Sequence, residues 1–392
     1  MKSIHEFVYT AQQHLRARHA LRIQRTHLYE LLAAAFGYKS YAAFCAESIF
    51  IRRPMSPLQA SGYMQRIIDR CGEIGHSQEA GIVTAEALCS MIGEHEICAS
   101  RMCDLIVQLQ RLKGREVDLD QFEFDEDESD EDEESEEGDQ DAISGFDDDL
   151  DIWIENLNPG LLTSSLDQAA ARGNPLAHYL LAIVHDPDGG EELQPGADYW
   201  YRQAQAGRVL SGFQKQFADE YEKALLNRAL YEKHLREAAR LGQPDALLEL
   251  AEKTGDPAFF EQNCGVVHTS PARVAEIAEE MGRVGDARSW RIRAANSGDL
   301  DVMRYLLERH SEHDLQQCWT WVYLARLMGV DFTEDDFYAI HEDGSDYDDD
   351  VGGPMFVDGR EGINLLPVGS EQDQQARKVA AELFEAIRRV DP

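Results

Sequence analysis

The sequence of 392 residues lacks the long apolar stretches of a membrane protein. No continuous run reaches about 18 apolar residues, the length that a transmembrane helix requires. The N-terminal stretch MKSIHEFVYTAQQHLRARHAL scatters charges where a secretory signal has an uninterrupted apolar segment. We therefore expect a cytoplasmic protein that has no contact with a membrane.

Cysteine is too scarce and too unevenly placed for a disulfide framework. The sequence holds seven cysteines, an odd number, at positions 45, 71, 89, 98, 103, 264 and 318, which predicts reduced thiols. A metal site made of Cys89, His95, Cys98 and Cys103 would not match the spacing of a zinc knuckle. Because Cys98 and Cys103 are five residues apart, we place them on different faces of a helix and interpret them as buried structural thiols.

Basic residues are missing from one stretch, 116–151, which contains 21 acidic residues. This stretch carries more than half of the net charge of −37. It cannot bury apolar area and it repels itself, so we predict a disordered, solubilising linker. A docking strip for a basic partner is the alternative. Because so acidic a protein should repel nucleic acid and anionic membranes, neither is an expected partner.

What the sequence does contain is a recurring stretch that ends in glycine. The stretches read LDQAAARGNP, WYRQAQAGRV, LREAARLGQP, WRIRAANSGD and WVYLARLMGV. Their glycines are Gly173, Gly207, Gly242, Gly298 and Gly329. A bulky residue precedes each glycine by seven or eight positions, on the same helical face: Leu166, Trp200, Leu235, Trp290 and Trp321. Four stretches also place alanine four residues before the glycine, so each predicts a closely packed helix that ends at its glycine.

Apolar residues at helical spacing follow the glycines and predict a second helix in each unit. The first two intervals between successive glycines are 34 and 35 residues, a length typical of helical repeats. Over about residues 160–330 the pattern resembles Sel1-like repeats, which are relatives of tetratricopeptide repeats. The resemblance implies an all-α solenoid that acts as a scaffold or adaptor for proteins. Gln203 replaces an expected alanine, and the long third interval leaves room for a degenerate helical unit that begins near Pro271. A generic helical bundle is the alternative fold.

The first 115 residues predict a small helical domain. Apolar residues within 3–21 share one helical face, and Gly37 ends a second helix. Residues 26–44 resemble a short helical module at the N-terminus of assorted bacterial proteins, including some glyoxalase-related ones. A DNA-binding helix–turn–helix is the alternative, but the segment SYAAFCAE lacks the basic and amide side chains that read bases.

The C-terminal part, 331–392, begins with an acidic loop. The loop holds three aspartates at alternate positions, Asp346, Asp348 and Asp350. The glycine and glutamate that an EF-hand requires are missing from their positions, so a weak calcium site is the remaining hypothesis here. A β-hairpin near 354–366 should turn at Asp358 and Gly359. A final helix from Ser370 should cap the repeat array.

These segments predict four parts, at 1–115, 116–151, 152–330 and 331–392. The sequence holds no phosphate-binding loop, nucleophile elbow or zinc-binding motif. We therefore predict a non-enzymatic scaffold without a cofactor, whose partner is another protein or peptide, and we assign the repeat tryptophans to helix packing. One alternative is an acidic inhibitor or immunity-type protein that blocks a basic enzyme. Another is a metal-dependent hydrolase built on loop residues such as His185 and Asp186.

Overall fold

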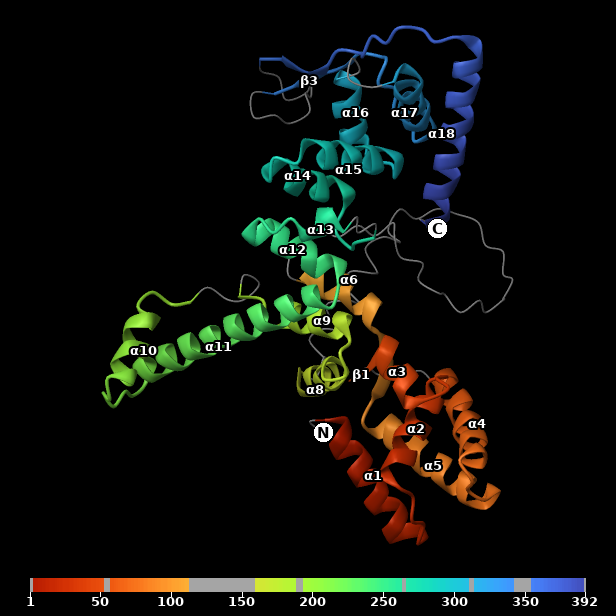
Figure 1. The fold of residues 1–392 in the computed structure, drawn as a ribbon, viewed down its shortest axis with the longest axis vertical. Helices are drawn as coiled ribbons and strands as arrows, with labels where there is room; N and C mark the ends of the chain where they lie inside the picture. The colour runs from red at the N-terminus through yellow and green to blue at the C-terminus, as the bar shows by residue number, and fades with distance from the viewer. Residues whose placement is uncertain are drawn as a thin grey trace. The chain divides into compact units, whose positions relative to one another are not determined.

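The computed structural model describes residues 3–52, 57–112, 159–187, 193–262, 266–309, 314–341 and 354–390. These residues are mostly helical and include two antiparallel sheets of two strands each (Figure 1). The predicted mainly α-helical class is confirmed.

The chain divides into two compact units, of which the first ends at Val266. None of the helices in the described residues combines the length and the apolar character needed to cross a membrane. The predicted linker lies outside these residues.

Unit 1 begins with a helical module that includes a small sheet. Its helices are α1 (Ile4–His19), α2 (Arg25–Ala35), α3 (Tyr41–Glu47), α4 (Pro57–Glu73), α5 (Gln78–Glu94) and α6 (Met102–Leu112). Strands β1 (Ser48–Arg52) and β2 (Ile97–Arg101) pair antiparallel, with Phe50 opposite Ala99. Helices α1, α2, α4 and α5 share a core that contains Phe7, Leu28 and Ile67.

The sheet corrects the interpretation of two cysteines. Cys98 lies on β2 and Cys103 lies on α6, so they do not share one helix. The break follows His95, which ends α5, and Glu96, whose φ of 52° cannot continue a helix.

Within the described residues, free thiols are buried at Cys45, Cys71, Cys98 and Cys318 and half-buried at Cys89 and Cys103. Burial raises the pKa of the Cys71 thiol to about 11, as expected of an unreactive structural cysteine.

The second part of unit 1 contains the first predicted repeats. Its helices are α8 (Pro159–Ala170), α9 (Pro175–Val184), α10 (Ala197–Gln205), α11 (Phe213–Arg240), α12 (Pro244–Thr254) and α13 (Ala258–Glu261). Helix α9 packs against α6, α8 and α11, and one core contains both Leu166 and Leu235. Asn174, which caps α9, also donates to the Ala46 carbonyl at 2.8 Å, and Leu161 joins the core of the N-terminal module. These helices and the N-terminal module are therefore packed together.

The five predicted repeat glycines end their helices in the same way. Each has a φ between 83° and 103°, a region that favours glycine. In each case the next N–H donates to the carbonyl four residues before the glycine: Asn174 to Ala169, Arg208 to Gln203, Gln243 to Ala238, Asp299 to Ala294 and Val330 to Ala325. This is the Schellman motif, and its four alanines are buried. The prediction that these glycines mark helix ends is confirmed.

A sixth glycine, Gly282, makes the same ending between α14 (Pro271–Glu280) and α15 (Val284–Asn296). Its φ is 72°, and the N–H of Arg283 donates to the carbonyl of Ala278 at 2.8 Å. Ser270 caps α14 by accepting a hydrogen bond from the Arg273 N–H. The predicted additional helical unit in the long third interval is therefore present, and its first helix ends in the same way.

Replacing Gly282 with alanine should lower the free energy of unfolding by about 1 kcal/mol, because alanine disfavours the left-handed backbone conformation. Crowding plays no part, since an added Cβ would meet no atom within 4 Å. The matched control is Gly285→Ala in the first turn of α15, where space is equally open and the backbone is helical. That change should raise stability by a few tenths of a kcal/mol. Urea unfolding measures both, and losses of equal size would contradict the conformational explanation.

Unit 2 continues from α14 and α15 with α16 (Leu300–Glu308), α17 (Leu315–Leu327), β3 (Asp336–Ile340), β4 (Phe356–Arg360) and α18 (Ser370–Val390). Each helix from α14 to α18 packs on the next. Trp321 is fully buried in their core and donates its indole N–H to Asn296 Oδ1 at 3.0 Å. Helix α18 buries Ala376 and Ala380 and packs along α17, where the sequence places a capping helix.

The predicted hairpin turn at Asp358 and Gly359 is wrong. Both residues lie within β4, which pairs antiparallel with β3. Gly359 stands opposite Phe337 with a φ of 116°, and an added Cβ would lie 1.7 Å from the carbonyl oxygen of Asp336. The glycine is thus required by a close approach of two backbones. Turns and close approaches both select glycine, and the local sequence does not distinguish them.

Candidate interaction surface

The polar residues singled out from the sequence do not form a metal site in the described structure. The aspartates of the calcium hypothesis lie outside the described residues: Asp346, Asp348 and Asp350. His185 ends α9, with its Nδ1 3.3 Å from Asn227 Oδ1 on α11, and the neighbouring Asp186 is buried. Across the residues that the structure describes, no group of three or more His, Cys, Asp or Glu side chains could hold a metal ion.

A pair of histidines connects α9 with α11. Nδ1 of His178 lies 3.0 Å from Nδ1 of His234, and the ring of His185 stacks on His234. Burial, followed by the positive charge of Lys233, lowers the pKa of His234 to about 4. Burial also lowers the pKa of His178. Both rings are therefore neutral at neutral pH, so that one nitrogen can donate to the other.

This pair should make unit 1 less stable in acid. Since the unfolded histidine has a pKa near 6.5 and the folded His234 has one of about 4, the unfolded chain binds an extra proton between these pH values. The free energy of unfolding should therefore decrease as the pH is lowered across this window, by on the order of 3 kcal/mol from His234. Urea unfolding at several pH values tests this. His234→Asn cannot take up the proton and should flatten the dependence; an unchanged slope would argue against His234.

A buried carboxylate, Glu249 on α12, joins four helices of unit 1. The hydroxyl of Tyr179 on α9 donates to its Oε2 at 3.1 Å, and the hydroxyl of Tyr231 on α11 donates to its Oε1. Gln110 on α6 donates in turn to the Tyr179 hydroxyl at 3.2 Å. The Lys253 ammonium lies 3.8 Å from Oε1. Because these groups hydrogen-bond one another inside the core, we interpret the network as structural.

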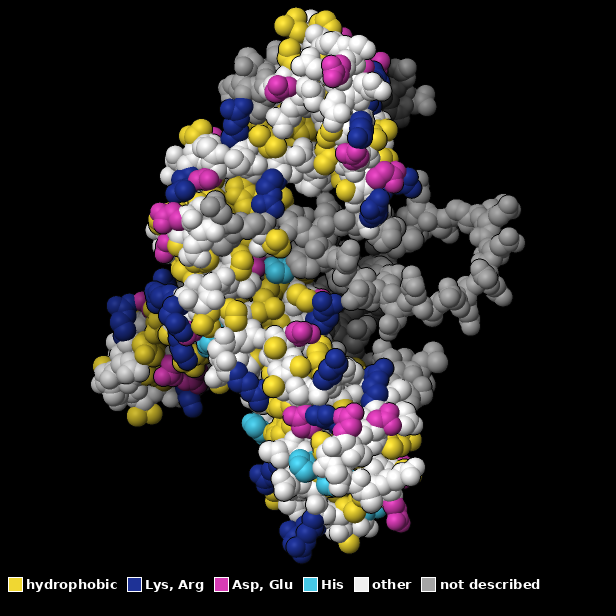
Figure 2. Space-filling view, turned by 45° about the vertical axis from the view of Figure 1, so that its right-hand side comes forward, with side chains coloured by type: hydrophobic (Ala, Val, Ile, Leu, Met, Phe, Trp, Pro, Cys, Tyr) yellow, Lys and Arg dark blue, Asp and Glu magenta, His cyan; other side chains and the backbone are white. Residues whose placement is uncertain are grey.

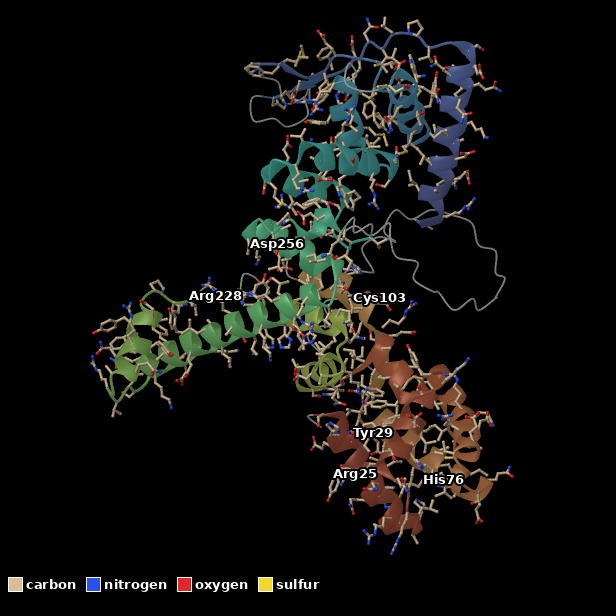
Figure 3. All side chains as sticks on the ribbon, viewed as in Figure 1. Arg25, Tyr29, His76, Cys103, Arg228 and Asp256 are labelled. Atoms are coloured by element: carbon tan, nitrogen blue, oxygen red, sulfur yellow. The ribbon has the colours of Figure 1, made fainter. Side chains whose placement is uncertain are left out.

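Helix α10 and the N-terminal part of α11 pack on each other and form a part of unit 1 that is largely exposed to solvent. We call this part the arm (residues 197–228). Helix α11 has 28 residues. Its C-terminal part packs on α9 and α12, whereas its N-terminal part packs on α10 and extends away from those helices (Figure 1). Arg228, labelled in Figure 3, marks the base of the arm. Within 213–228, all of which is described, Ala218 is the one buried side chain.

Aromatic side chains line the arm and remain partly exposed. The Trp200 ring meets the Phe213 ring edge-on, with centroids 6.2 Å apart, and the Arg208 guanidinium lies 5.5 Å over the Trp200 ring. Phe213 is 60% exposed, and Val209 in the connecting loop is 94% exposed. Apolar side chains are visible on this lobe beside Lys and Arg (Figure 2). Trp, Tyr, Phe and Arg are the residues that contribute most of the binding energy at protein interfaces.

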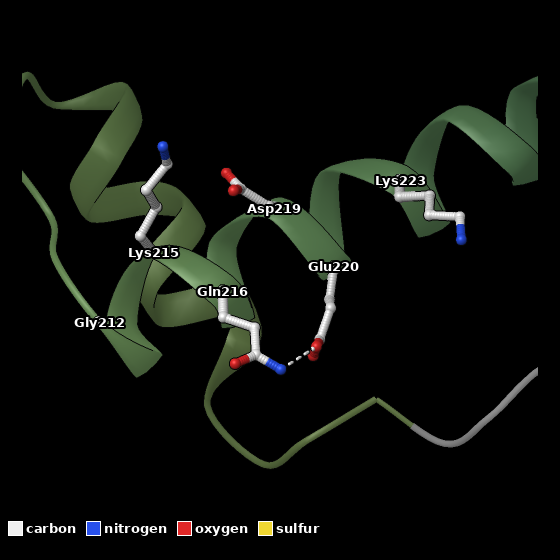
Figure 4. A pocket seen from close by; sticks show the side chains of 6 residues that line it. All are labelled: Gly212, Lys215, Gln216, Asp219, Glu220 and Lys223. Atoms are coloured by element: carbon white, nitrogen blue, oxygen red, sulfur yellow. Dashed lines mark hydrogen bonds between the residues drawn. The ribbon is translucent and has the colours of Figure 1, made fainter.

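A shallow groove of about 440 Å³ runs along another face of the arm (Figure 4). It is lined by Gly212, Lys215, Gln216, Asp219, Glu220 and Lys223. Gln216 donates to Glu220 Oε1 at 2.9 Å. The lining carries charges of both signs and is widely open to solvent, which is unsuited to excluding water from a reaction. We interpret this groove as the solvated face of α11.

Trp200 differs from the tryptophans at the equivalent repeat positions. Trp290 and Trp321 are buried, in agreement with the assignment to helix packing, whereas Trp200 is half-buried at the surface of the arm. The sequence contains one signal of this difference. Gln203 takes the place of the small residue with which the other repeats pack closely, so α10 is the repeat helix least suited to a tight helix contact.

The arm therefore stands out as an apolar surface without a catalytic arrangement. Residues 197–228 carry aromatic and aliphatic side chains together with charges of both signs, and they include neither a cysteine nor a histidine. Comparison with protein-family models, curated proteins and solved structures gives no match.

Proposed function

We propose that this protein is a non-enzymatic adaptor built of Sel1-like helical repeats, and that it binds another protein through the arm. The observation that carries the proposal is the exposed aromatic and aliphatic surface around Phe213 and Val209. Apolar surface of this kind marks interaction sites on soluble proteins. Its transfer out of water on binding gains free energy in proportion to the area covered.

The charges on the arm support an apolar mode of binding. Arg202 pairs with Asp198, and Arg228 lies 3.6 Å from a carboxylate oxygen of Glu232. Because such exposed pairs offset one another, the arm has little net charge with which to attract a strongly charged partner. Binding should therefore depend weakly on salt, whereas an acidic inhibitor of a basic enzyme would lose its partner at high salt.

The buried polar groups of unit 1 also favour binding over catalysis. Glu249 accepts from two tyrosine hydroxyls, and His178 and His234 contact each other. A general acid or base must instead reach the substrate within a cleft. Glu249, His178 and His234 instead contact side chains on neighbouring helices.

The test compares the full chain with a Val209→Ser, Phe213→Ser variant as bait in an extract of the source cells. Proteins are captured at low and at high salt and quantified by mass spectrometry. We expect a protein that the unaltered chain retains at both salt concentrations and that the variant retains at least about tenfold less, since two central apolar contacts are lost. The identified protein is then titrated against both purified chains by calorimetry.

Val284→Ser is the matched control. Val284 lies on α15 in unit 2 and is 74% exposed, so its replacement removes a similar apolar side chain away from the arm. The control should retain every partner of the unaltered chain. Equal retention by the arm variant, or an equal loss in the control, would show that the arm does not bind the partner.

A further inference from the structure

The sheet of β3 and β4 in unit 2 exposes apolar side chains on both of its faces. Paired residues share a face and successive residues alternate, so Phe337 lies with Val357 on one face and Tyr338 lies with Phe356 on the other. Phe337 is 53% exposed and Val357 is 65% exposed. Among the described elements, β3 and β4 contact chiefly each other. An uncovered sheet with large apolar side chains is an unusual surface for a protein to present to water.

The sheet is anchored firmly at one end. The N–H of Ile363, after β4, donates to the carbonyl of Phe332, before β3, at 2.8 Å. Arg304 on α16 donates to the carbonyl of Glu361 at 3.1 Å, and its guanidinium lies 5.9 Å over the ring of the buried Phe332. Because these contacts hold both strands against the helices, a ligand would meet a preformed edge and would lose less entropy on binding.

A two-stranded sheet has two outer edges, each with backbone N–H and C=O groups that point away from the partner strand. In the described residues this sheet consists of β3 and β4, without a third strand. Two strands alone are marginally stable in water, and a third strand stabilises them. Extended peptides bind such edges by strand addition, in which backbone hydrogen bonds give affinity and alternate side chains give specificity.

The charge around the sheet indicates which extended peptide fits. Within the described ranges 331–341 and 354–361, six residues are acidic and a single one, Arg360, is basic. On the strands themselves, Asp336 and Asp358 are exposed. A second copy of this sheet would bring acidic residues against acidic residues and is therefore disfavoured. A cationic strand would be attracted and aligned.

We propose that the β3–β4 sheet binds an extended, basic segment of another protein, which adds to the sheet as a third strand and alternates Lys or Arg with apolar side chains. The apolar side chains of the segment contact those of the sheet, and its cationic side chains face the surrounding carboxylates. This surface belongs to unit 2 and the arm belongs to unit 1, so the two proposals are independent and can fail separately.

The first test uses three fluorescent peptides of about eight residues, the length of a typical strand. The probe alternates lysine with valine, the second peptide has an N-methyl group on every backbone amide, and the third has glutamate in place of lysine. Anisotropy titration with the full chain should show binding of the probe and at least about tenfold weaker binding of the N-methylated peptide, which lacks donors for the ladder. The glutamate peptide should not bind. Equal binding of the first two peptides would mean simple charge attraction and would overturn the proposal.

The second test locates the bound probe. Asp336→Lys reverses one charge on β3 and should weaken binding roughly tenfold at low salt, because an attraction becomes a repulsion at short range. Glu385→Lys makes the same charge change at an exposed position of α18 and should leave affinity within about twofold, since distant exposed charges are screened. Phe356→Ser, which keeps the charge, should also weaken binding. Circular dichroism confirms that each variant is folded.

Two results would overturn the assignment to the sheet. One is an equal effect of Asp336→Lys and Glu385→Lys, which would place the probe elsewhere on this acidic chain. The other is self-association of the full chain that Phe356→Ser abolishes in analytical ultracentrifugation, which would make a second copy the occupant of the sheet.

Discussion

Trp321→Ala is expected to lower the free energy of unfolding of unit 2 by about 4 kcal/mol, within the range for truncating a large buried aromatic side chain. The Trp321 side chain has no exposed surface, and its indole N–H donates to Asn296 at 3.0 Å. Truncation leaves a cavity between packed helices and removes the hydrogen-bond partner of the Asn296 amide oxygen. Urea unfolding followed by far-ultraviolet circular dichroism measures the loss without depending on tryptophan fluorescence.

Trp200→Ala is the matched comparison, because Trp200 occupies nearly the same position in its own repeat stretch. It is half-buried and contacts Phe213 and Arg208 at the surface of the arm. Its truncation should therefore cost about 1 kcal/mol of stability, as is usual for a partly exposed site, while removing a large part of the proposed binding surface. If Trp200→Ala destabilised the protein as much as Trp321→Ala, the difference in burial would not explain the stability of the two sites.

Glu249→Ala is expected to lower the free energy of unfolding of unit 1 by about 3 kcal/mol. The change removes the acceptor of the Tyr179 and Tyr231 hydroxyls, which remain inside the core and lose a hydrogen bond each. A buried polar group deprived of its partner costs about 1 to 3 kcal/mol, and two such groups are affected here. Equilibrium urea unfolding gives the difference directly.

Glu249→Gln separates the hydrogen bonds from the charge. Glutamine has nearly the same shape and keeps one acceptor, while its amide can donate to the other hydroxyl. The expected loss is therefore smaller, about 1 kcal/mol. If glutamine and alanine destabilise unit 1 equally, the negative charge beside Lys253 is the important property and the hydrogen-bond network is not.

The helix ends could be predicted from the sequence because they depend on residues close together in the chain. A glycine with an alanine four positions earlier specifies both the backbone conformation and the close packing of the helix. Four of the five predicted endings have this pattern, while Gly207 has Gln203 at the alanine position. The sixth ending, at Gly282, follows the same rule with Ala278 at the alanine position. The fully buried Trp321 also follows from helical periodicity alone.

The two sheets could not be predicted in the same way, because each strand forms only against a distant partner. The stretch that contains Cys98 has a short apolar pattern that is compatible with a helix. It forms a strand because it pairs with β1, where Cys98 lies opposite Ile51. Gly359 likewise depends on the approach of Asp336. The exposure of the arm also depends on distant parts of the chain. Periodicity identifies the apolar face of a helix, but it does not show whether another helix covers that face.

The helix endings also determine the order in which this chain can fold. In each ending the closing hydrogen bond joins residues only five positions apart, as from Asn174 to Ala169, so that a ribosome-bound chain can complete it soon after those residues emerge. Strand β3, by contrast, must wait until β4 has been synthesised, and β1 must wait for β2, because contacts between distant residues form slowly. The repeat helices should thus gain structure progressively during translation, and the edge proposed to receive a basic segment should be among the last parts of the protein to appear.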